Sequence, residues 1–232
     1  ILYLGGGAIH AGAAAVARAC ADKASLPTTM SLMGLGIIGP EHDLYLGMLG
    51  MHASRATNMA LQECDLLIGA GVRFDDRATG KIGEFCPDAR IIHIDIDPCE
   101  ISKLRNVHLG LIGDVHQILG ALLPYLELRE RSAWRRRIRQ LRHSYPFFCA
   151  EQLDFAKPYG IIMRVAELAG DEPIITTDVG KHQMWTAQMY PFSRPRQLLT
   201  SGGLGTMGFG LPAAIGAALA HPGRQVICFS GD

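Results

Sequence analysis

Apolar residues in this chain form short runs, and the stretches between these runs have the spacing of amphipathic helices. Such continuous runs are typical of strands in a parallel sheet that is covered on both faces. The expected strands are 1–4, 27–30, 65–71, 89–97, 107–114, 173–180, 196–203 and 224–232. The expected helices are 11–23, 55–63, 115–126, 159–170, 183–189 and 206–220. Because strands and helices alternate, the sequence predicts an α/β fold with a doubly wound parallel sheet.

The pattern changes once along the chain. Residues 128–157 are rich in arginine, and the alternation of strands and helices resumes after them. We therefore expect a first α/β domain at 1–127 and a second at 158–232, joined by a charged linker or helix. Because the sequence starts at Ile1 and stops directly after an expected strand, we expect an excerpt of a longer chain whose second domain is truncated.

The arginine-rich stretch RERSAWRRRIRQLRHS allows two interpretations. Clustered arginines can bind the phosphate backbone of a nucleic acid. Alternatively, Trp134, Ile138 and Leu141 recur at helical spacing, which gives the segment one apolar face. An amphipathic helix that packs on a domain and leaves its arginines in solvent is the favoured interpretation.

Charge and cysteine usage limit the classes of function. The 22 basic and 22 acidic residues cancel, so no global field attracts nucleic acid or an anionic membrane. The six cysteines are scattered without a Cys-x-x-Cys pair or a zinc-like histidine spacing, so we expect reduced thiols in a cytoplasmic compartment. A membrane span needs about 18 consecutive apolar residues, and the sequence has no such stretch.

Three glycines, Gly5 to Gly7, follow the first expected strand and precede a helix. Glycines at this place let backbone N–H groups approach a phosphate at the N-terminus of the helix. The segment departs from the G-x-G-x-x-G fingerprint because His10 occupies the place of the third glycine. Alone, these glycines are a weak indication of a nucleotide site.

Charged residues follow two further strands of the first domain. In HIDIDP, Asp95 can accept hydrogen bonds from a ribose at the strand end, whereas Asp97 before Pro98 can equally cap a short helix. A second group follows Gly71 and consists of Arg73, Asp75, Asp76 and Arg77. Because such charges are costly to bury unpaired, they either pair with one another in a solvated loop or meet a charged ligand.

The last three expected strands bring three loops to one edge of the second sheet. The first loop lies in TTDVGKHQMW, the second in TSGGLGTMGFG, and the third is the closing GD. Glycines before an alanine-rich helix offer backbone donors to an anion. A diphosphate carries more charge than helix ends can balance, so a hard cation is expected, and Asp232 is a suitable Mg²⁺ ligand. The alternative for the closing Gly-Asp pair is an ordinary turn.

The segments GMLGMH, GVRFDDRATGK, HIDIDP, TTDVGKHQMW and SGGLGTMGFGLPAAIGAA, with the closing GD, resemble the large subunit of acetolactate synthase, a thiamine-diphosphate enzyme, especially its bacterial biosynthetic isozymes. The resemblance covers essentially the whole chain. It implies that 1–127 is the middle domain, with a Rossmann-like sheet that binds FAD, and that 158–232 opens the thiamine-diphosphate-binding domain. It also implies a preceding domain with the glutamate that activates the cofactor.

The resemblance assigns residues to each cofactor. Those implied around the flavin are Gly5, Gly6, Gly7, Leu46, Gly47, Met48, Leu49, Gly50, Met51, His52, Arg73, Asp76, Arg77, Asp95, Ile96 and Asp114. Those implied for thiamine diphosphate are Val179, Gly180, Lys181, His182, Gly205 and Met207, with Asp232 for Mg²⁺. The Gly205 carbonyl would accept a hydrogen bond from the aminopyrimidine, and Met207 would hold the cofactor bent. Met207, Gly205, Arg73 and Val179 are the residues implied closest to the chemistry.

The resemblance implies a transferase that decarboxylates pyruvate and joins the product to a second 2-oxo acid, pyruvate or 2-oxobutanoate. This is the first common step of branched-chain amino acid biosynthesis, leading to isoleucine and valine. It further implies a cytoplasmic homodimer or tetramer, often with a small regulatory subunit, and a flavin without net redox chemistry. The excerpt alone is expected to be inactive.

Two positions depart from the family's pattern, and two other functions compete. Lys181 stands where glutamine is usual, and Ala53 where glycine is usual, which matters if that position needs a positive φ. One alternative is another thiamine-diphosphate decarboxylase or carboligase. The other is a nucleotide-binding module without thiamine chemistry, which leaves the three loops of the second domain unexplained.

Overall fold

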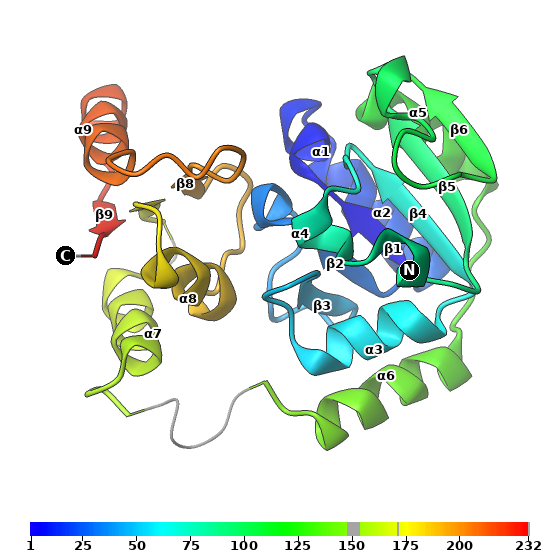
Figure 1. Cartoon of the computed structure of the whole chain (residues 1–232), viewed down its shortest axis with the longest axis horizontal. Helices are drawn as coiled ribbons and strands as arrows, with labels where there is room; N and C mark the ends of the chain where they lie inside the picture. The colour runs from blue at the N-terminus through cyan, green and yellow to red at the C-terminus, as the bar shows by residue number, and fades with distance from the viewer. Residues whose placement is uncertain (148–153, 171, 232) are drawn as a thin grey trace. The chain divides into compact units, whose positions relative to one another are not determined.

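The computed structural model describes residues 1–147, 154–170 and 172–231 (Figure 1). The chain divides into two compact units, Ile1–Phe147 and Phe148–Asp232, each with its own parallel sheet. The predicted α/β class is therefore confirmed. Within the described part, no helix combines the length and the apolar character that a membrane crossing needs.

The first unit contains a sheet of six parallel strands in the order β3-β2-β1-β4-β5-β6. The strands are β1 (Leu2–Leu4), β2 (Thr28–Met30), β3 (Tyr45–Met48), β4 (Leu66–Ala70), β5 (Arg90–Asp95) and β6 (Leu109–Ile112). This is the strand order of the dinucleotide-binding fold, in which the chain direction across the sheet reverses between the first and fourth strands. Loops after β1 and β4 therefore flank the crevice where such sheets bind ligands.

Several helical segments of the first unit begin at a residue whose side chain caps them. The α-helices are α1 (Gly6–His10), α2 (Ala14–Ala24), α3 (Arg55–Glu63), α4 (Asp76–Thr79), α5 (Val115–Leu122) and α6 (Ser132–Ser144), and a 3₁₀ turn, η3 (Pro98–Glu100), follows β5. The Ser54 hydroxyl accepts from the Thr57 N–H at the start of α3, and the Asp114 carboxylate accepts from the Gln117 N–H at the start of α5. Side-chain caps of this kind satisfy amides that have no partner in the helix.

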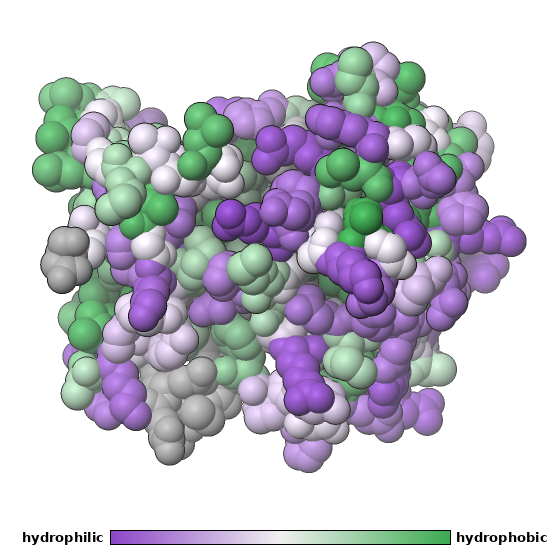
Figure 2. Space-filling view, in the orientation of Figure 1, coloured by the Kyte–Doolittle hydropathy of each residue, from purple (hydrophilic) through white to green (hydrophobic). Residues whose placement is uncertain are grey.

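Helix α6 decides between the two interpretations of the arginine-rich segment. It lies along α3 (Figure 1), and its Ile138 and Leu141 side chains are buried in the core of the first unit. On its outer side, Arg137 pairs with Glu63 through two hydrogen bonds of 2.7 and 2.6 Å, and Figure 2 shows a largely hydrophilic surface there. The favoured prediction of an amphipathic helix on a domain is thus confirmed.

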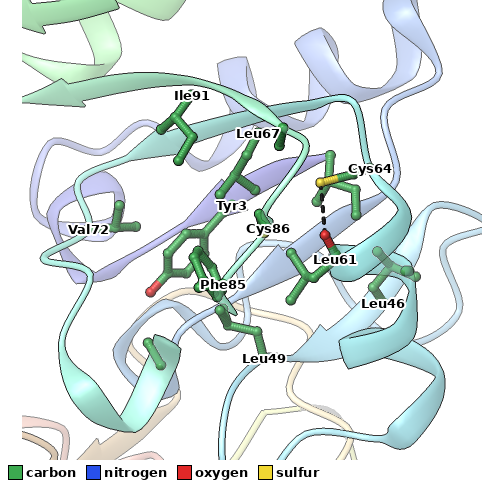
Figure 3. Close-up of a cluster of buried hydrophobic side chains, with 14 of the residues drawn as sticks. Tyr3, Leu46, Leu49, Leu61, Cys64, Leu67, Val72, Phe85, Cys86 and Ile91 are labelled. Carbon is green, nitrogen blue, oxygen red and sulfur yellow. Dashed lines mark hydrogen bonds between the residues drawn. The ribbon is translucent and has the colours of Figure 1, made fainter. Parts of the chain in front are cut away.

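One apolar cluster fills the space between the sheet and the helices α3 and α6 (Figure 3). Tyr3 points into this cluster, and Leu2 and Leu4 lie on the opposite face of the same strand, because side chains alternate along a strand. Phe74 lies edge-on to Tyr3 and to Phe85, with ring centroids 5.9 and 6.2 Å apart. Burial of both sheet faces explains the continuous apolar runs of the sequence.

The second unit contains three parallel strands in the order β8-β7-β9. Its elements are α7 (Pro158–Ala169), β7 (Ile174–Thr177), α8 (Lys181–Met189), β8 (Leu198–Thr200), α9 (Gly210–Ala220) and β9 (Val226–Phe229). Strand β9 is half-buried, not buried as expected, because it is an outer strand of the described sheet. Helix α9 exposes Leu211, Ile215 and Leu219, and apolar side chains gather over it in Figure 2.

Several elements differ from the predictions. Strand β3 was not predicted, helix α1 occupies residues expected to form a loop, and the expected helix 11–23 corresponds to α2, which begins at Ala14. The expected helix 206–220 begins only at Gly210.

Candidate functional site

The turns after β1 and β4 are joined by backbone hydrogen bonds at the switch point of the six-stranded sheet. The Gly7 N–H donates to the Gly71 carbonyl over 3.1 Å, and Gly5 donates to the Ala70 carbonyl over 3.1 Å. A Cβ atom on Gly7 would lie 2.6 Å from Gly71 Cα, so only glycine permits this approach. Two of the three glycine N–H groups that the sequence offered to a phosphate are therefore directed at protein carbonyls.

The segment after β3 is joined to the turn after β4. The Met51 N–H donates to the Arg77 carbonyl over 2.9 Å, and the Asn58 side chain donates to the Gly50 carbonyl over 3.0 Å. Gly50 has a φ of 94° and packs against the Arg77 and Ala78 backbone. Two segments expected to contact FAD, 46–52 and 73–77, are thus brought side by side, and Met51 remains exposed.

The charged turn after β4 is fixed by an aromatic residue in its centre. Phe74 is buried with a φ of 50°, a strained conformation for a side chain of this size. Its ring packs on that of His93, 4.9 Å away, and His93 Nε2 contacts the Val72 carbonyl at 2.8 Å. Because Phe74 is directed inwards, the adjacent Arg73 is held outside the core.

The charges of this turn pair weakly with one another in solvent. The Arg73–Asp75 and Arg77–Asp76 pairs both have N–O distances of 3.8 Å, and all four side chains are exposed. Such pairs contribute about 0–1 kcal/mol, so they leave the guanidinium groups available to a ligand. Asp75 has a local role as well, because its Oδ1 accepts from the Ala78 N–H and caps α4.

The two aspartates of HIDIDP have different positions. Asp95 is the last residue of β5 and is buried, and its Oδ1 accepts from the Asp97 N–H over 3.0 Å. Asp97 caps η3 by accepting from the Cys99 N–H, the structural alternative for this residue. Ile96 between them is exposed. Asp114, also expected near the flavin, follows β6 and caps α5 through Oδ1.

In the second unit, hydrogen bonds between side chains hold the ends of β7 and β8 together. The Thr177 and Thr200 hydroxyl groups lie 2.7 Å apart, and the buried Gln183 amide donates to Thr200 Oγ1 over 2.7 Å. The end of β9 is joined to β7 through the Asp178 N–H, which donates to the Phe229 carbonyl over 3.0 Å. The three strand ends that the sequence placed at one edge therefore lie together.

The residues at the start of α8 face the ends of two strands. Val179, Gly180, Lys181 and His182 follow β7, and the Lys181 side chain is exposed. The His182 ring lies beside both Gly180 and Gly231: an added Cβ would be 3.0 Å from its Cε1 at Gly180 and 3.1 Å from its Nδ1 at Gly231. His182 is thus in contact with the turn that leads to Asp232, which lies outside the described residues.

Asp178 is a functional candidate that sequence reasoning did not single out. Its Oδ1 accepts from the N–H groups of Val179 and Gly208, over 2.7 and 2.9 Å, and its Oδ2 accepts from the Gly210 N–H over 2.9 Å. The backbone hydrogen bonds from Gly210, Val179 and Gly208, in that order of size, lower the pKa of the Asp178 carboxyl. The anion that faces the N-terminus of α9 is therefore the protein's own carboxylate.

The loop between β8 and α9 presents Met207 to solvent. Gly205 and Gly208, on either side of Met207, have φ values of 63° and 85°, a conformation that glycine adopts readily. The Thr206 N–H donates to Ser201 Oγ over 2.8 Å on one side, and Gly208 is bound to Asp178 on the other. Met207 is 77% exposed. A fixed backbone combined with a projecting thioether side chain is suited to contact with a ligand.

The described part of the second unit brings the expected thiamine diphosphate residues into two adjoining groups. A Cβ atom on Gly205 would lie 3.8 Å from Val179 Cγ1, so the first group, 179–182, adjoins the second, 205–207. Among the described residues, no group of three or more histidine, cysteine, aspartate or glutamate side chains is arranged to hold a metal. The position of Asp232 stays a prediction.

The departure at Ala53 causes no backbone strain. Ala53 is not among the described non-glycine residues with positive φ, and its N–H donates to the Gly50 carbonyl over 3.1 Å. The left-handed conformations of this segment occur at Gly47 and Gly50 instead. An alanine is therefore compatible with the turn.

Comparison with protein families matches both units. The thiamine pyrophosphate enzyme central domain matches residues 1–122. The thiamine pyrophosphate enzyme C-terminal TPP binding domain matches residues 178–232.

Individual relatives match over the whole chain. The acetolactate synthase isozyme 1 large subunit of Escherichia coli (strain K12) is 56% identical over 232 residues, which are 100% of this chain and 41% of that protein. The isozyme 2 large subunit of the same organism is 44% identical over 232 residues, 42% of its length. The acetolactate synthase large subunit of Porphyra purpurea is 44% identical over 240 residues, 40% of its length. The chain thus spans about two fifths of the curated relatives it matches.

Proposed function

Because the chain belongs to the thiamine pyrophosphate enzyme family, we propose that it is part of the catalytic large subunit of an acetolactate synthase. The reaction is decarboxylation of pyruvate and transfer of the two-carbon product to a second 2-oxo acid, pyruvate or 2-oxobutanoate. This reaction begins the common route to the branched-chain amino acids isoleucine and valine. The observation that carries the proposal is the 56% identity with an acetolactate synthase large subunit across all 232 residues.

The second unit has a donor set that fits thiamine diphosphate. When bound, this cofactor supplies the nucleophilic carbon and the electron sink for decarboxylation. Val179 and Gly205 adjoin each other, so both can contact the same cofactor. The Gly205 carbonyl accepts a hydrogen bond from the aminopyrimidine in this proposal, and Met207 packs against the cofactor and excludes water.

Mg²⁺ completes the proposed diphosphate site. The first amide of α9 is directed at Asp178, so that helix end has less positive potential to offer a diphosphate. A divalent cation therefore supplies the charge balance, with Asp232 as its protein ligand and with waters and phosphate oxygens in its remaining positions. In this proposal Lys181, which is exposed at the start of α8, adds a further cationic contact.

The first unit fits FAD at the carboxyl edge of its sheet. The residues proposed for the flavin lie in or directly after β1, β3, β4, β5 and β6, towards the carboxyl ends of these strands, and the switch point lies between β1 and β4. Arg73 and Arg77 are exposed with only weak partners, which suits contact with a pyrophosphate. Asp95 is buried at the end of β5, at the carboxyl edge of the sheet where such folds bind ligands. The flavin is structural in this proposal.

The proposal also covers the oligomeric state, the domain boundaries and the cellular location. We place the flavin domain at 1–127, the link at 128–157 and the thiamine diphosphate domain from 158. A homodimer or tetramer and a small regulatory subunit are supported by the name "large subunit" of the relatives and by the exposed apolar side chains of α9. A cytoplasmic location is supported by the five cysteines of the described residues, which are all free thiols.

The test is the reaction itself, with the full-length protein that contains this chain. Incubated with pyruvate, thiamine diphosphate and Mg²⁺, the protein is expected to form acetolactate, and omission of either cofactor is expected to abolish the product. A purified protein that binds thiamine diphosphate and consumes pyruvate but releases acetaldehyde would assign it to another decarboxylase of the family. A protein that does not bind thiamine diphosphate would refute the proposal.

A further inference from the structure

We propose that Asp178 is a positioning residue, whose carboxylate fixes the Gly205–Met207 segment in the conformation that receives thiamine diphosphate. The proposal rests on the function proposed above for this site. Asp178 itself does not need to touch the cofactor. It acts through the backbone of the loop that carries Met207.

The geometry of the carboxylate supports this role. Asp178 directly follows β7, and its donors Gly208 and Gly210 lie 30 and 32 positions further along the chain. A single carboxylate therefore ties three segments together: the end of β7, the loop after β8 and the first turn of α9. Hydrogen bonds to an ionised acceptor are roughly twice as strong as those between neutral groups. The bond to Gly208, directly after Met207, fixes the chain next to the exposed thioether.

The sequence around Asp178 is adapted to this contact. An added Cβ on Gly210 would lie 2.5 Å from the Asp178 N atom, so glycine is required for α9 to approach the end of β7. Helix α9 has no side-chain cap from its own N-cap residue, Phe209. Asp178 thus caps α9 from a distant strand, and the first N–H of this helix has a protein partner before any ligand arrives.

The residue before Met207 is held by a separate hydrogen bond, so the part of the loop's rigidity that depends on Asp178 can be measured by itself. Ser201 Oγ accepts from the Thr206 N–H, directly before Met207. With both attachments, Met207 lies between two fixed residues. Without the bonds to Asp178, only the Ser201 side remains, and Gly208 allows the chain to move because glycine populates both positive and negative φ.

The experiment compares three variants of the full-length protein: Asp178→Asn, Asp178→Ala and the control Asp154→Asn. Asparagine keeps the size of the side chain but places an amide donor against one of the three N–H groups, and alanine removes all three bonds. Asp154 is a matched control, because it lies in the same unit and accepts one backbone hydrogen bond, from Ala156 over 2.9 Å, away from this loop.

The readouts separate positioning from folding and from the proposed function. We expect turnover per bound thiamine diphosphate to fall about tenfold in Asp178→Asn and about 100-fold in Asp178→Ala, the scale of one and of several charged hydrogen bonds. The near-ultraviolet circular dichroism of the bound cofactor is expected to change, the KM for pyruvate to stay within about twofold because the substrate contacts are retained, and the control to resemble the parent protein. Unchanged turnover per bound cofactor and an unchanged spectrum in both variants would overturn the proposal, even if less holoenzyme forms. If the parent protein binds no thiamine diphosphate, the proposed function fails instead.

Discussion

The turns after β1 and after β8 are both rich in glycine, but they use it differently. After β1, glycine lets backbone pack on backbone: Gly7 donates to Gly71, and no side chain takes part. After β8, Gly210 also approaches the backbone of Asp178, but Gly208 and Gly210 in addition donate to the Asp178 carboxylate. A backbone contact tolerates almost no substitution, whereas a hydrogen bond to a carboxylate depends on its charge. The first kind suits a structural nucleotide site, and the second suits a loop that positions a reacting cofactor.

The largest effect is expected from Gly71→Ala in the first unit. Gly71 has a φ of 62°, and its added Cβ would lie 2.5 Å from the Ala8 N atom, so the turns after β1 and β4 must separate. Strain and overpacking together are expected to cost about 3 kcal/mol or more. The thermal unfolding midpoint and the flavin absorbance of the full-length protein measure this loss. Gly83→Ala is the control, because nothing lies within 4 Å of its added Cβ; a flavin-bound Gly71→Ala protein with normal stability would contradict the prediction.

Two glycines of α9 differ in what surrounds them, and they test the close approach of this helix to β7. Gly210→Ala places a methyl group 2.5 Å from the Asp178 N atom, whereas an added Cβ on Gly216 meets nothing within 4 Å. We expect Gly210→Ala to destabilise the protein by about 1–3 kcal/mol and Gly216→Ala to stabilise it by about 0.5–1 kcal/mol. Thermal unfolding of the two variants is expected to shift in opposite directions. Equal shifts would show that α9 does not approach β7 as described.

A double-mutant cycle tests whether Asp178 acts through Met207. Residues of one network have coupling energies of about 0.5–3 kcal/mol, whereas independent sites are additive. Asp178→Asn is therefore expected to lower turnover per bound cofactor much less in a Met207→Ala background than in the parent protein. The corresponding cycle of Asp154→Asn with Met207→Ala is expected to be additive. Additivity in both cycles would show that Asp178 does not act through Met207.

The smallest expected effect is on the stability of the protein at low pH. The pKa of the Asp178 carboxyl is lowered in the folded protein, so its stabilising contribution is complete above the ordinary value of 3.8 and is lost as pH falls through the lower native value. The parent protein is thus expected to lose stability more steeply below about pH 4 than Asp178→Asn does. Acid titration followed by tryptophan fluorescence measures the two slopes. Identical slopes would indicate that the carboxylate is not held as described.

Local sequence patterns predicted the elements that are continuous and apolar, and missed those decided by distant contacts. Strands β4 and β5 were predicted because their residues are covered on both faces. Strand β3 was missed, because Tyr45–Met48 is short, contains Gly47 and alternates between half-buried and buried positions. The start of α9 was placed too early, at Thr206. The helix begins at Gly210, where Asp178 caps it from 32 positions away.

The roles of the candidate site residues were also only partly predictable from the sequence. Carboxylates at the ends of strands could be recognised from the sequence, and Asp95 lies at the end of β5 as expected. Their individual partners were only partly predictable, because Asp97 before Pro98 could be identified as a possible cap, whereas Asp114 and Asp178 show no pattern beyond an acidic residue after an apolar run. In the structure, the first two cap the element that follows them, and the third caps a helix after the next strand. The one available signal for Asp178 was its position at the end of β7, beside the predicted segment 179–182.

The exposure of Met207 has a chemical consequence. A thioether that is 77% exposed on a fixed loop is open to peroxide, and oxidation would convert it into a polar, chiral sulfoxide. A cofactor packed against Met207 would shield its sulfur atom, so the protein is expected to be sensitive to oxidants when empty and protected when loaded. Mass spectrometry of the peptide that contains Met207, after peroxide treatment with and without thiamine diphosphate, would measure this protection. Cofactor supply would then determine how long the enzyme survives oxidative stress as well as how fast it works.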